Sequence, residues 1–382
     1  MTRGLAILGS TGSIGRQTLD VVRAHPGRFT VLGLASGHRD GEIERQAAEW
    51  PSASVYTSQG RPAWLESPRW TESLEALALA DGVEIVVVAT TGMSALPAVL
   101  AALAAGRTVA LANKETLVTG GHLVAAALDR VSGDPLDRLR PVDSEHSAIW
   151  QCLRGERPED VARLILTASG GPFRERDPQT LEGISAEEAL AHPTWRMGPK
   201  ITIDSATLVN KAFEAIEAKW LYGLPYSRIE AVIHPRSVVH SLVEFVDGSF
   251  KAQLGLPDMR LPIQYALTHP ERAPSPAAVA SPVEWGTLEF LPLDPARFPA
   301  YRIVRDAAAA GGNRGAVLNA ADEVAVAAFL DGRIGFTRIP GLVEAALERW
   351  GSDREPDLET ILALDAEVRG GLAALPAAGG QG

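Results

Sequence analysis

The sequence of 382 residues is too long for one ordinary hydrophobic core, so we expect two or three domains. Its net charge of -11 argues against a general nucleic-acid binder, because nucleic-acid phosphates attract Lys and Arg. The single cysteine, Cys152, excludes an intrachain disulfide and a zinc site built from several thiolates, and it agrees with a reducing cytoplasm.

No segment has the pattern of a secretory signal, a transit peptide or a membrane span. The N-terminal residues 4–9 enter directly into a strand pattern, without a basic or long apolar leader. The longest apolar runs, such as 83–89, have only the length of a strand. We therefore expect a bacterial cytoplasmic protein with neither a membrane nor a nucleic-acid partner.

Residues 1–140 alternate short apolar strands with helical stretches, of which 94–105 is a clear case. The predicted strands are 5–9, 30–35, 85–89 and 108–112. Such alternation implies a parallel sheet with helices on both faces. The sequence therefore predicts an α/β protein whose N-terminal domain is Rossmann-like and doubly wound.

A glycine-rich turn follows the first predicted strand and opens a helix. It reads Gly9-Ser-Thr-Gly-Ser-Ile-Gly15, so its spacing is GxxGxxG rather than GxGxxG. Glycines let the backbone approach a pyrophosphate, and the helix N-terminus offers amides and a positive dipole end to the anion. A glycine-rich turn without a ligand is the alternative, but the strand–turn–helix context favours a dinucleotide site.

The end of the second predicted strand suits NADP better than NAD. NAD enzymes usually carry an acidic residue here for the ribose hydroxyl, whereas Ser36, His38 and Arg39 suit a 2′-phosphate. Asp40 argues the other way, and an exposed loop arginine is the alternative interpretation of Arg39.

Two further segments lie just past predicted strand ends, where open α/β sheets bind ligands. They are Ala89-Thr-Thr-Gly92 and Ala112-Asn-Lys-Glu115. For Asn113 to Glu115, a plain solvated turn is an equally good interpretation until other observations are added.

From residue 141 to 268 the pattern changes to that of an α+β domain. The predicted strands are 164–168, 231–234, 238–246 and 249–254, and 206–220 is predicted to be helical. Asp247-Gly248, between the last two strands, is a hairpin signal. We expect a mixed or antiparallel sheet.

Asp143-Ser-Glu145 places two carboxylates two residues apart. On an extended backbone both would point to the same side, and two like charges held close need a cation or a proton between them. Oxygen ligands of this kind suit Mg²⁺ or Mn²⁺. A solvated edge is the alternative for the pair taken alone.

The predicted helix after Asp204 supports the metal interpretation. Ser205 is a natural N-cap, and Asn210, Lys211 and Glu214 share one helical face. An amide and an ammonium beside a carboxylate suit a site for both an anion and a metal. A helix-stabilising Lys–Glu pair is the alternative.

Two loops in this domain suit ligand binding. Thr167 to Phe173 leaves a strand into a Gly-Gly turn that exposes backbone amides and a hydroxyl, although Pro172 also permits an ordinary turn. His192-Pro-Thr-Trp-Arg-Met-Gly198 predicts a lid that excludes water, with a loop anchored on the core as the alternative. His234 and His240 flank a predicted strand start, and a lone histidine is more often structural than catalytic. We interpret Cys152 as a buried structural thiol.

The C-terminal third separates into a connector and a helical region. Residues 269–299 hold seven prolines, which predicts a semi-rigid connector. The helical patterns that follow are 301–310, 315–330, 339–349 and 357–375, which together suggest a small bundle. The expected domains are thus 1–140, 141–268 and 300–376, joined by the connector 269–299.

Taken in order, these motifs closely resemble those of the 1-deoxy-D-xylulose 5-phosphate reductoisomerase family over nearly the whole chain. Each motif alone is weak to moderate, but the ordered set is highly specific. The matching stretches are Gly9-Ser-Thr-Gly-Ser-Ile-Gly15, Ala112-Asn-Lys-Glu115, Val142-Asp-Ser-Glu-His146, Ala168-Ser-Gly-Gly-Pro-Phe173, His192-Pro-Thr-Trp-Arg-Met-Gly198, Ile203-Asp-Ser-Ala-Thr207, Asn210-Lys211, Glu214, Val232-Ile-His-Pro235, Asp258-Met-Arg260 and Asn319-Ala-Ala-Asp-Glu-Val324.

The resemblance implies a homodimer of chains with an NADPH domain, a catalytic domain and a C-terminal helical domain, acting on a small phosphorylated sugar. It implies one Mg²⁺, Mn²⁺ or Co²⁺ ion held by Asp143, Glu145 and Glu214. The implied catalytic residues are Asp143, Glu145, Glu214, Lys211 and His192. The implied substrate-binding residues are Ser144, Glu145, Ser169, His192, Trp195, Ser205, Asn210, Lys211, Glu214 and His240. The implied cofactor-binding residues are Thr11, Gly12, Ser13, Ile14, Gly37, Arg39, Asn113, Lys114, Glu115, Met197 and Gly198.

There are departures from the family's pattern. Many members carry Asn at the position of Thr194 and a small residue at Arg196, and Lys-Asn where this chain has His38-Arg39. The last difference leaves the 2′-phosphate contact open, although Arg39 could supply it. None of these departures touches the implied metal ligands.

The activity implied by the resemblance is the conversion of 1-deoxy-D-xylulose 5-phosphate to 2-C-methyl-D-erythritol 4-phosphate. A metal-assisted skeletal rearrangement, by retroaldol cleavage or a direct carbon shift, would precede hydride transfer from NADPH. One alternative is an NADP enzyme of the semialdehyde or homoserine dehydrogenase type, whose acyl-intermediate form would need Cys152 as nucleophile. The other is a catalytically silent NADPH-binding sensor.

Overall fold

The structure is a computed structural model that describes residues 2–37, 40–195 and 197–373. The chain forms two compact units, each built around its own β-sheet. Unit 1 comprises Met1–Thr116, His122–Arg154 and Asp258–Ala280, and unit 2 comprises Leu117–Gly121, Gly155–Pro257 and Ser281–Gly382. The predicted domains were defined by function, whereas these units are defined by compactness, so the predicted domain limits stay predictions.

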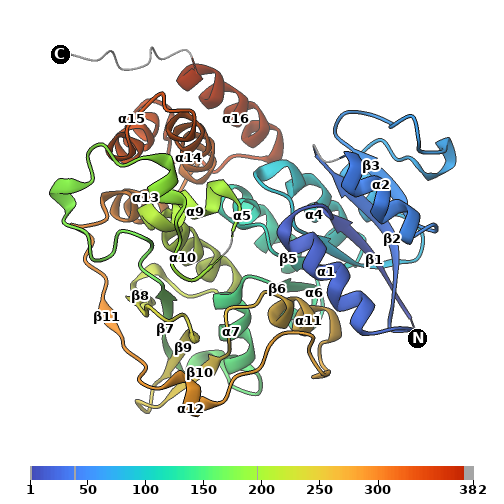
Figure 1. The fold of residues 1–382 in the computed structure, drawn as a ribbon, viewed down its shortest axis with the longest axis horizontal. Helices are drawn as coiled ribbons and strands as arrows, with labels where there is room; N and C mark the ends of the chain where they lie inside the picture. The colour runs from blue at the N-terminus through green and yellow to red at the C-terminus, as the bar shows by residue number, and fades with distance from the viewer. Residues whose placement is uncertain (1, 38–39, 196, 374–382) are drawn as a thin grey trace. The chain divides into compact units, whose positions relative to one another are not determined.

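Unit 1 contains a six-stranded parallel sheet in the order β3-β2-β1-β4-β5-β6, part of which is the blue region of Figure 1. Its strands are β1 (Arg3–Leu8), β2 (Phe29–Ser36), β3 (Ser54–Thr57), β4 (Val83–Val88), β5 (Thr108–Leu111) and β6 (Leu139–Pro141). This is the strand order of the Rossmann fold, whose ligands bind where the order reverses, here between β1 and β4. The predicted doubly wound domain is confirmed.

Both faces of this sheet are buried, as the apolar strands predicted. Along β1, Leu5 and Ile7 belong to a core that also contains Leu19 and Ile263 from helices on that side. Gly33 on β2 faces the other side, because a Cβ there would lie 2.9 Å from Leu77. The helices and 3₁₀ turns of unit 1 are α1 (Ser13–Ala24), α2 (Asp40–Glu49), η1 (Ser67–Arg69), α3 (Leu74–Ala78), η2 (Met93–Ala95), α4 (Leu96–Ala104), α5 (Lys114–Leu128, which passes through unit 2 at Leu117–Gly121), α6 (Pro135–Arg138), α7 (Ser144–Leu153) and α11 (Arg260–Thr268).

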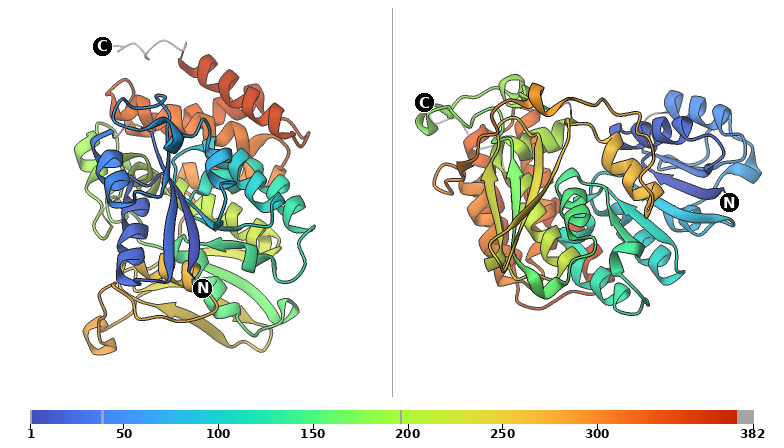
Figure 2. Two further views of the ribbon diagram at one scale, coloured as in Figure 1. Left: turned by 90° about the vertical axis from the view of Figure 1, so that its right-hand side faces the viewer. Right: turned by 90° about the horizontal axis from the view of Figure 1, so that it is seen from below.

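Unit 2 contains a five-stranded sheet in the order β10-β9-β7-β8-β11, whose longer strands run side by side in the right panel of Figure 2. Its strands are β7 (Val161–Ala168), β8 (Ile229–Ile233), β9 (Val239–Phe245), β10 (Phe250–Leu254) and β11 (Leu291–Pro292). Only the β7–β8 pair is parallel, so the predicted mixed sheet is confirmed. The Asp247-Gly248 hairpin is also confirmed, with Gly248 at φ 81.

Helices pack on this sheet and on one another. Helix α10 lies against β7 and β8, and α14 contacts α9, α13, α15 and α16, which confirms the predicted C-terminal helical bundle. The helices and 3₁₀ turns of unit 2 are η3 (Pro158–Asp160), η4 (Pro178–Thr180), α8 (Ala186–Leu190), α9 (Pro199–Thr207), α10 (Val209–Tyr222), η5 (Tyr226–Arg228), α12 (Pro282–Trp285), α13 (Pro299–Ala310), α14 (Arg314–Leu330), η6 (Phe336–Arg338), α15 (Ile339–Trp350) and α16 (Leu358–Ala373). No helix in the described part of the chain has the length and apolar character needed to cross a bilayer.

Two local predictions are wrong. The single helix predicted over 206–220 is two helices that meet at Leu208, which adopts the left-handed conformation at φ 60 and ψ 14. Ser205 is therefore not an N-cap but lies in the last turn of α9. A leucine rarely adopts this conformation, so nothing in the sequence marks the break.

The extended backbone assumed for Asp143-Ser-Glu145 is also wrong. Asp143 is the N-cap residue of α7, and Ser144 and Glu145 form the first turn of that helix. The reason is that β6 ends at Pro141 and the chain turns directly into a helix.

Candidate active site

In the glycine-rich turn between β1 and α1, neighbouring backbone atoms lie too close to two of the glycines to leave room for a side chain. Gly9 has φ +90, and a Cβ there would lie 2.4 Å from the carbonyl oxygen of Ala89. A Cβ on Gly15 would lie 2.3 Å from the carbonyl oxygen of Gly9. Gly12 is the N-cap of α1 and contributes no capping side chain. The turn is therefore compact, and the first amides of α1 are not occupied by a side-chain cap.

The loop after β1 contacts the end of β2, and the loop after β5 is hydrogen-bonded to the loop after β4. The hydroxyl groups of Thr11 and Ser36 lie 2.9 Å apart. The Asn113 side-chain amide donates to the carbonyl oxygens of Thr90 at 2.9 Å and Gly92 at 2.8 Å. Asn113 is 2% exposed and its side-chain oxygen caps α5, so the solvated-turn interpretation of this segment is wrong.

The Asp143–Glu145 segment lies at the start of α7, where the helix dipole stabilises negative charge. The Asp143 carboxylate forms an ion pair with Lys114 and lies 3.9 Å from Nε2 of His146. The Ser144 hydroxyl donates a hydrogen bond to the Glu145 carboxylate. His146 is fully buried, and the sequence motifs did not predict its position beside Asp143.

The predicted shared face of α10 is confirmed. One Glu214 oxygen accepts a hydrogen bond from the side-chain amide of Asn210 at 2.7 Å, and the other pairs with the Lys211 ammonium. Glu214 is 1% and Lys211 3% exposed. A buried charge needs a partner and further hydrogen bonds, and Glu214 has both.

Ser169, His192 and Ser205 form a group that we call the serine–histidine cradle. The His192 Nε2 atom lies 3.0 Å from the Ser169 hydroxyl and 3.1 Å from the Ser205 hydroxyl. The Gly171 N–H donates to the Ser169 hydroxyl at 3.2 Å. These polar side chains come from the end of β7, the loop predicted to be a lid, and α9, and together they offer several hydrogen-bonding groups to an anion.

Comparisons with known proteins cover almost the whole chain. Family models described as 1-deoxy-D-xylulose 5-phosphate reductoisomerase, its C-terminal domain, and the DXP reductoisomerase C-terminal domain match residues 5–121, 139–222 and 254–370. A 1-deoxy-D-xylulose 5-phosphate reductoisomerase from Geobacillus kaustophilus is 50% identical over 378 residues, covering 96% of this chain and 97% of the relative. The chain belongs to the 1-deoxy-D-xylulose 5-phosphate reductoisomerase family.

Other members of the reductoisomerase family agree with this assignment. The relative from Thermomicrobium roseum is 48% identical over 375 residues, covering 97% of this chain and 96% of the relative. A crystal structure of DOX-P reductoisomerase in complex with NADPH, fosmidomycin and magnesium has a TM-score of 0.90, 38% identity and coverage of 97% and 98% of the two chains. The Zymomonas mobilis enzyme in complex with NADPH has a TM-score of 0.87 and 38% identity, covering 98% and 99%.

In this reductoisomerase-family chain, the loop predicted to be a lid lies against the sheet of unit 2 at Trp195. The Trp195 ring is 6.3 Å from the ring of His240, which is 5% exposed on β9. Met197 is half-buried and Gly198 is the N-cap of α9. Arg39 lies outside the described residues, and Gly37 is exposed.

The structural interpretations of His234 and Cys152 agree with their surroundings. His234 Nδ1 lies 2.7 Å from the carbonyl oxygen of Glu289, and Nε2 accepts the N–H of Val238 at 3.2 Å. Both ring nitrogens are thus occupied by the backbone. Cys152 is 7% exposed in α7.

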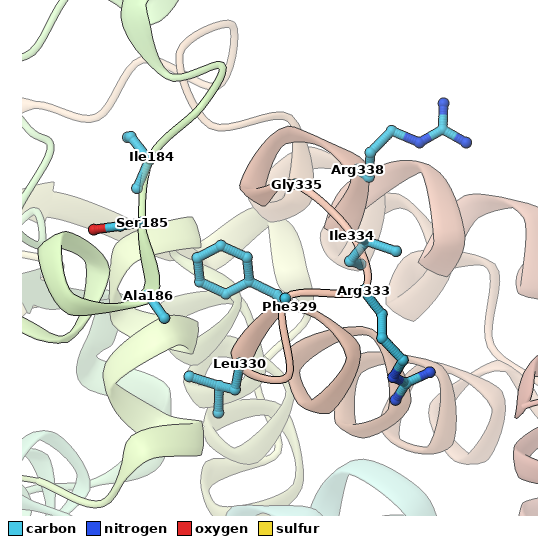
Figure 3. A pocket seen from close by; sticks show the side chains of 10 residues that line it. Ile184, Ser185, Ala186, Phe329, Leu330, Arg333, Ile334, Gly335 and Arg338 are labelled. Atoms are coloured by element: carbon cyan, nitrogen blue, oxygen red, sulfur yellow. The ribbon is translucent and has the colours of Figure 1, made fainter. Parts of the chain in front are cut away.

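A pocket of about 520 Å³ lies elsewhere in unit 2 and contains none of the predicted site residues. Figure 3 shows the long side chains of Arg333 and Arg338 pointing away from the space between Ala186 and Phe329. The lining residues are Ile184, Ser185, Ala186, Phe329, Leu330, Gly332, Arg333, Ile334, Gly335 and Arg338.

Proposed function

We propose that this chain converts 1-deoxy-D-xylulose 5-phosphate to 2-C-methyl-D-erythritol 4-phosphate, a step in isoprenoid precursor biosynthesis. The carbon skeleton rearranges with the help of a divalent metal ion, and NADPH then donates a hydride. Relatives of this name at 50% and 48% identity over nearly the full length support the assignment. The observation that carries it is the serine–histidine cradle, whose hydroxyl, imidazole and amide groups suit a phosphate.

The turn after β1 fits NADPH. Its glycines at positions 9 and 15 admit no Cβ, so the backbone itself forms the surface of the turn. The uncapped start of α1 suits the pyrophosphate, and the Thr11–Ser36 contact joins this turn to the end of β2. The residues proposed to hold the cofactor are Thr11, Gly12, Ser13, Ile14, Gly37, Arg39, Asn113, Lys114, Glu115, Met197 and Gly198.

The donor set of Asp143, Glu145 and Glu214 fits a hard divalent cation, because all three offer carboxylate oxygens. We propose these residues as the ligands of Mg²⁺, Mn²⁺ or Co²⁺. When bound, the ion supplies Lewis-acid stabilisation for negative charge that develops on substrate oxygens during the rearrangement. The structures of related enzymes that contain magnesium support this proposal.

The chain's own side chains bind and orient the substrate. Ser169, Ser205 and His192 donate or accept hydrogen bonds at the phosphate, and Asn210 and Lys211 add an amide and a cation. Remote binding of the phosphate holds the reacting carbons in place. Ser144 contacts the substrate hydroxyls, and His240 lies near the substrate as a supporting group. Trp195 and Met197 lie on the lid, which excludes water from the site.

We further propose that the protein is a cytoplasmic homodimer. Residues 1–140 form the NADPH domain, 141–268 the catalytic domain and 300–376 the C-terminal helical domain, with 269–299 as connector. The family membership supports each of these assignments.

The decisive assay treats the protein with a chelator and then measures the decrease in NADPH absorbance in the presence of 1-deoxy-D-xylulose 5-phosphate. The measurement is made with and without added Mg²⁺ or Mn²⁺. We expect turnover only when both metal and substrate are present. A folded protein that binds NADPH but shows no metal-dependent turnover would contradict the proposal and favour the sensor alternative.

A further inference from the structure

A charge cluster with two buried carboxylates joins α9 to α14, and we call its members, Lys200, Asp204 and Asp322, the Lys200 cluster; the Lys200 side chain itself is 25% exposed. The Lys200 ammonium lies 2.6 Å from an Asp204 oxygen on the same helix and 2.8 Å from an Asp322 oxygen on α14. It also lies 5.1 Å from the ring centre of Phe213. Asp204 and Asp322 are 2% and 1% exposed. One cation therefore serves two buried carboxylates from different helices.

Apolar residues flank this cluster on both helices. Ile203 and Ala206 on α9 and Ala325 and Val326 on α14 belong to one hydrophobic core, which extends to Phe329 at the pocket of Figure 3. In such a medium an unpaired charge is expensive, and attraction between paired charges is strong. The relative position of α9 and α14 is therefore restricted to one in which Lys200 reaches both carboxylates.

The side of α14 that faces α9 carries buried polar residues where apolar residues would also form a stable contact. Asn319, one turn before Asp322, is fully buried, and within the described residues neither of its side-chain amide atoms has a hydrogen-bond partner. Well-packed apolar side chains would usually form a contact at least as stable. A polar contact retained in an apolar core thus points to a requirement for one defined position of α9.

That position matters because α9 carries part of the cradle. Asp204 immediately precedes Ser205, whose hydroxyl lies 3.1 Å from His192 Nε2. A Cβ on Gly171 would lie 2.6 Å from the Ser205 carbonyl oxygen, so the Gly-Gly turn packs directly on α9 at this point. Lys200 also lies two residues after Gly198, where the lid ends. A shift of α9 would therefore move Ser205, the turn and the lid's end together.

We propose that Lys200, Asp204 and Asp322 are positioning residues for the substrate's phosphate group. Through Lys200, α14 of the C-terminal bundle holds α9 so that Ser205 completes the cradle. This inference rests on the proposed function, since it assigns the phosphate to the cradle.

The test uses Asp322→Asn, which keeps the side chain's size and removes its charge. We expect KM for 1-deoxy-D-xylulose 5-phosphate to rise about tenfold while kcat changes less than about threefold. The inhibition constant of inorganic phosphate, which competes with the substrate, rises in parallel because phosphate occupies the cradle without contacting the rest of the substrate site. Glu323→Gln is the matched control: Glu323 is the next residue on α14 and pairs with Arg369 of α16 at 2.9 Å, so KM and the phosphate constant stay unchanged.

Two variants test whether the positive charge of Lys200 is required, one that keeps the charge and one that removes it. Lys200→Arg keeps a charge that can serve two carboxylates and retains a KM near that of the wild type, whereas Lys200→Met raises KM. Where Lys200→Met fails to fold, Asp322→Asn carries the test. An unchanged KM and phosphate constant in Asp322→Asn would overturn the inference. So would a loss of kcat and melting temperature at constant KM, which indicates a merely structural role.

The two proposals can fail separately. Absence of turnover in the wild-type protein would contradict the proposed function. Calorimetry of inorganic phosphate binding to wild type and Asp322→Asn would still test the cluster, and equal affinities would overturn it.

Discussion

The Nδ1 atom of His192 accepts the backbone N–H of Trp195 at 2.9 Å, and this contact decides which ring nitrogen faces the cradle. Nδ1 also accepts the N–H of Thr194 at 3.1 Å, so it carries no proton. The proton of the neutral ring is therefore on Nε2, beside Ser169 and Ser205. One imidazole thus orders the start of the lid and presents a donor to the proposed phosphate.

The first prediction concerns pH. Burial lowers the pKa of His192, so between its native and its unfolded pKa the unfolded chain binds more protons than the native protein. The contribution of neutral His192 to stability is complete above the unfolded pKa of about 6.5 and is lost as the pH falls through that value toward the lowered native one. We expect the wild type to lose more unfolding free energy than His192→Asn when urea denaturation is repeated at about pH 7.5 and about pH 5.5. His269, whose pKa burial also lowers, is present in both proteins and cancels; equal pH dependence would contradict the assignment.

The second prediction separates the two ring nitrogens. In His192→Asn the side-chain oxygen takes the place of Nδ1, so the Thr194 and Trp195 amides keep their acceptor while the cradle loses its donor. In His192→Gln the amide NH₂ takes the place of Nε2 and the lid's turn loses its acceptor. We expect His192→Asn to raise the phosphate inhibition constant about tenfold, and His192→Gln to accelerate hydrogen exchange at the two lid amides. The reverse pattern would show that the tautomer is assigned wrongly.

The third prediction tests the proposed metal ligands. Glu214→Gln keeps the acceptor for Asn210 but removes the charge, so we expect a loss of about 3 kcal/mol of transition-state stabilisation, or roughly a hundredfold in kcat/KM. Glu230→Gln applies the same change to an exposed carboxylate that pairs with Arg163 at 2.7 Å, and it should leave turnover unchanged. The measurement is kcat/KM against Mg²⁺ concentration for both variants. Wild-type turnover in Glu214→Gln would contradict the ligand assignment.

The unit 1 sheet was predictable from the sequence because both faces of its strands are buried, so each long strand is a continuous apolar run. The strands β3 (Ser54–Thr57) and β6 (Leu139–Pro141) were missed, since runs of four and three residues carry too little periodicity. Helix α11 was missed for another reason: it lies next to a proline-rich segment in sequence, yet its apolar side packs in the core of unit 1. Local patterns did not show that residues 258–280 return to the first unit.

In the candidate site, the sequence motifs identified the polar residues but did not predict the backbone conformation that carries them. The shared face of Asn210, Lys211 and Glu214 follows from helical spacing alone and is confirmed. The break at Leu208 could not be predicted, because leucine disfavours the left-handed conformation that it adopts there. The Lys200–Asp322 pair joins residues 122 positions apart and leaves no local signal.

The fourth prediction separates folding from cofactor binding at the turn after β1. A Cβ on Gly15 would lie 2.3 Å from backbone, so Gly15→Ala should destabilise the protein by about 1–3 kcal/mol. Gly12 has φ -72, and its nearest neighbour to an added Cβ is 3.3 Å away, so Gly12→Ala should fold with a nearly unchanged melting temperature. Its methyl group would still keep the pyrophosphate from the backbone, which should weaken NADPH binding about tenfold. Equal NADPH affinity in Gly12→Ala and wild type would argue against a pyrophosphate site at this turn.

The last prediction distinguishes the reductoisomerase from a thiol-dependent dehydrogenase. Cys152 is 7% exposed in α7, two residues after the fully buried Trp150, so it occupies the position of a small core residue. Cys152→Ala should therefore lower the unfolding free energy by about 1 kcal/mol through a small cavity and leave kcat within about twofold of the wild type. Alkylation of the native protein should be slow for the same reason, because a buried thiol is poorly accessible to the reagent. Abolished turnover in a Cys152→Ala protein of normal melting temperature would instead require a covalent thiol intermediate, and the carboxylates of α7 and α10 would then need another role.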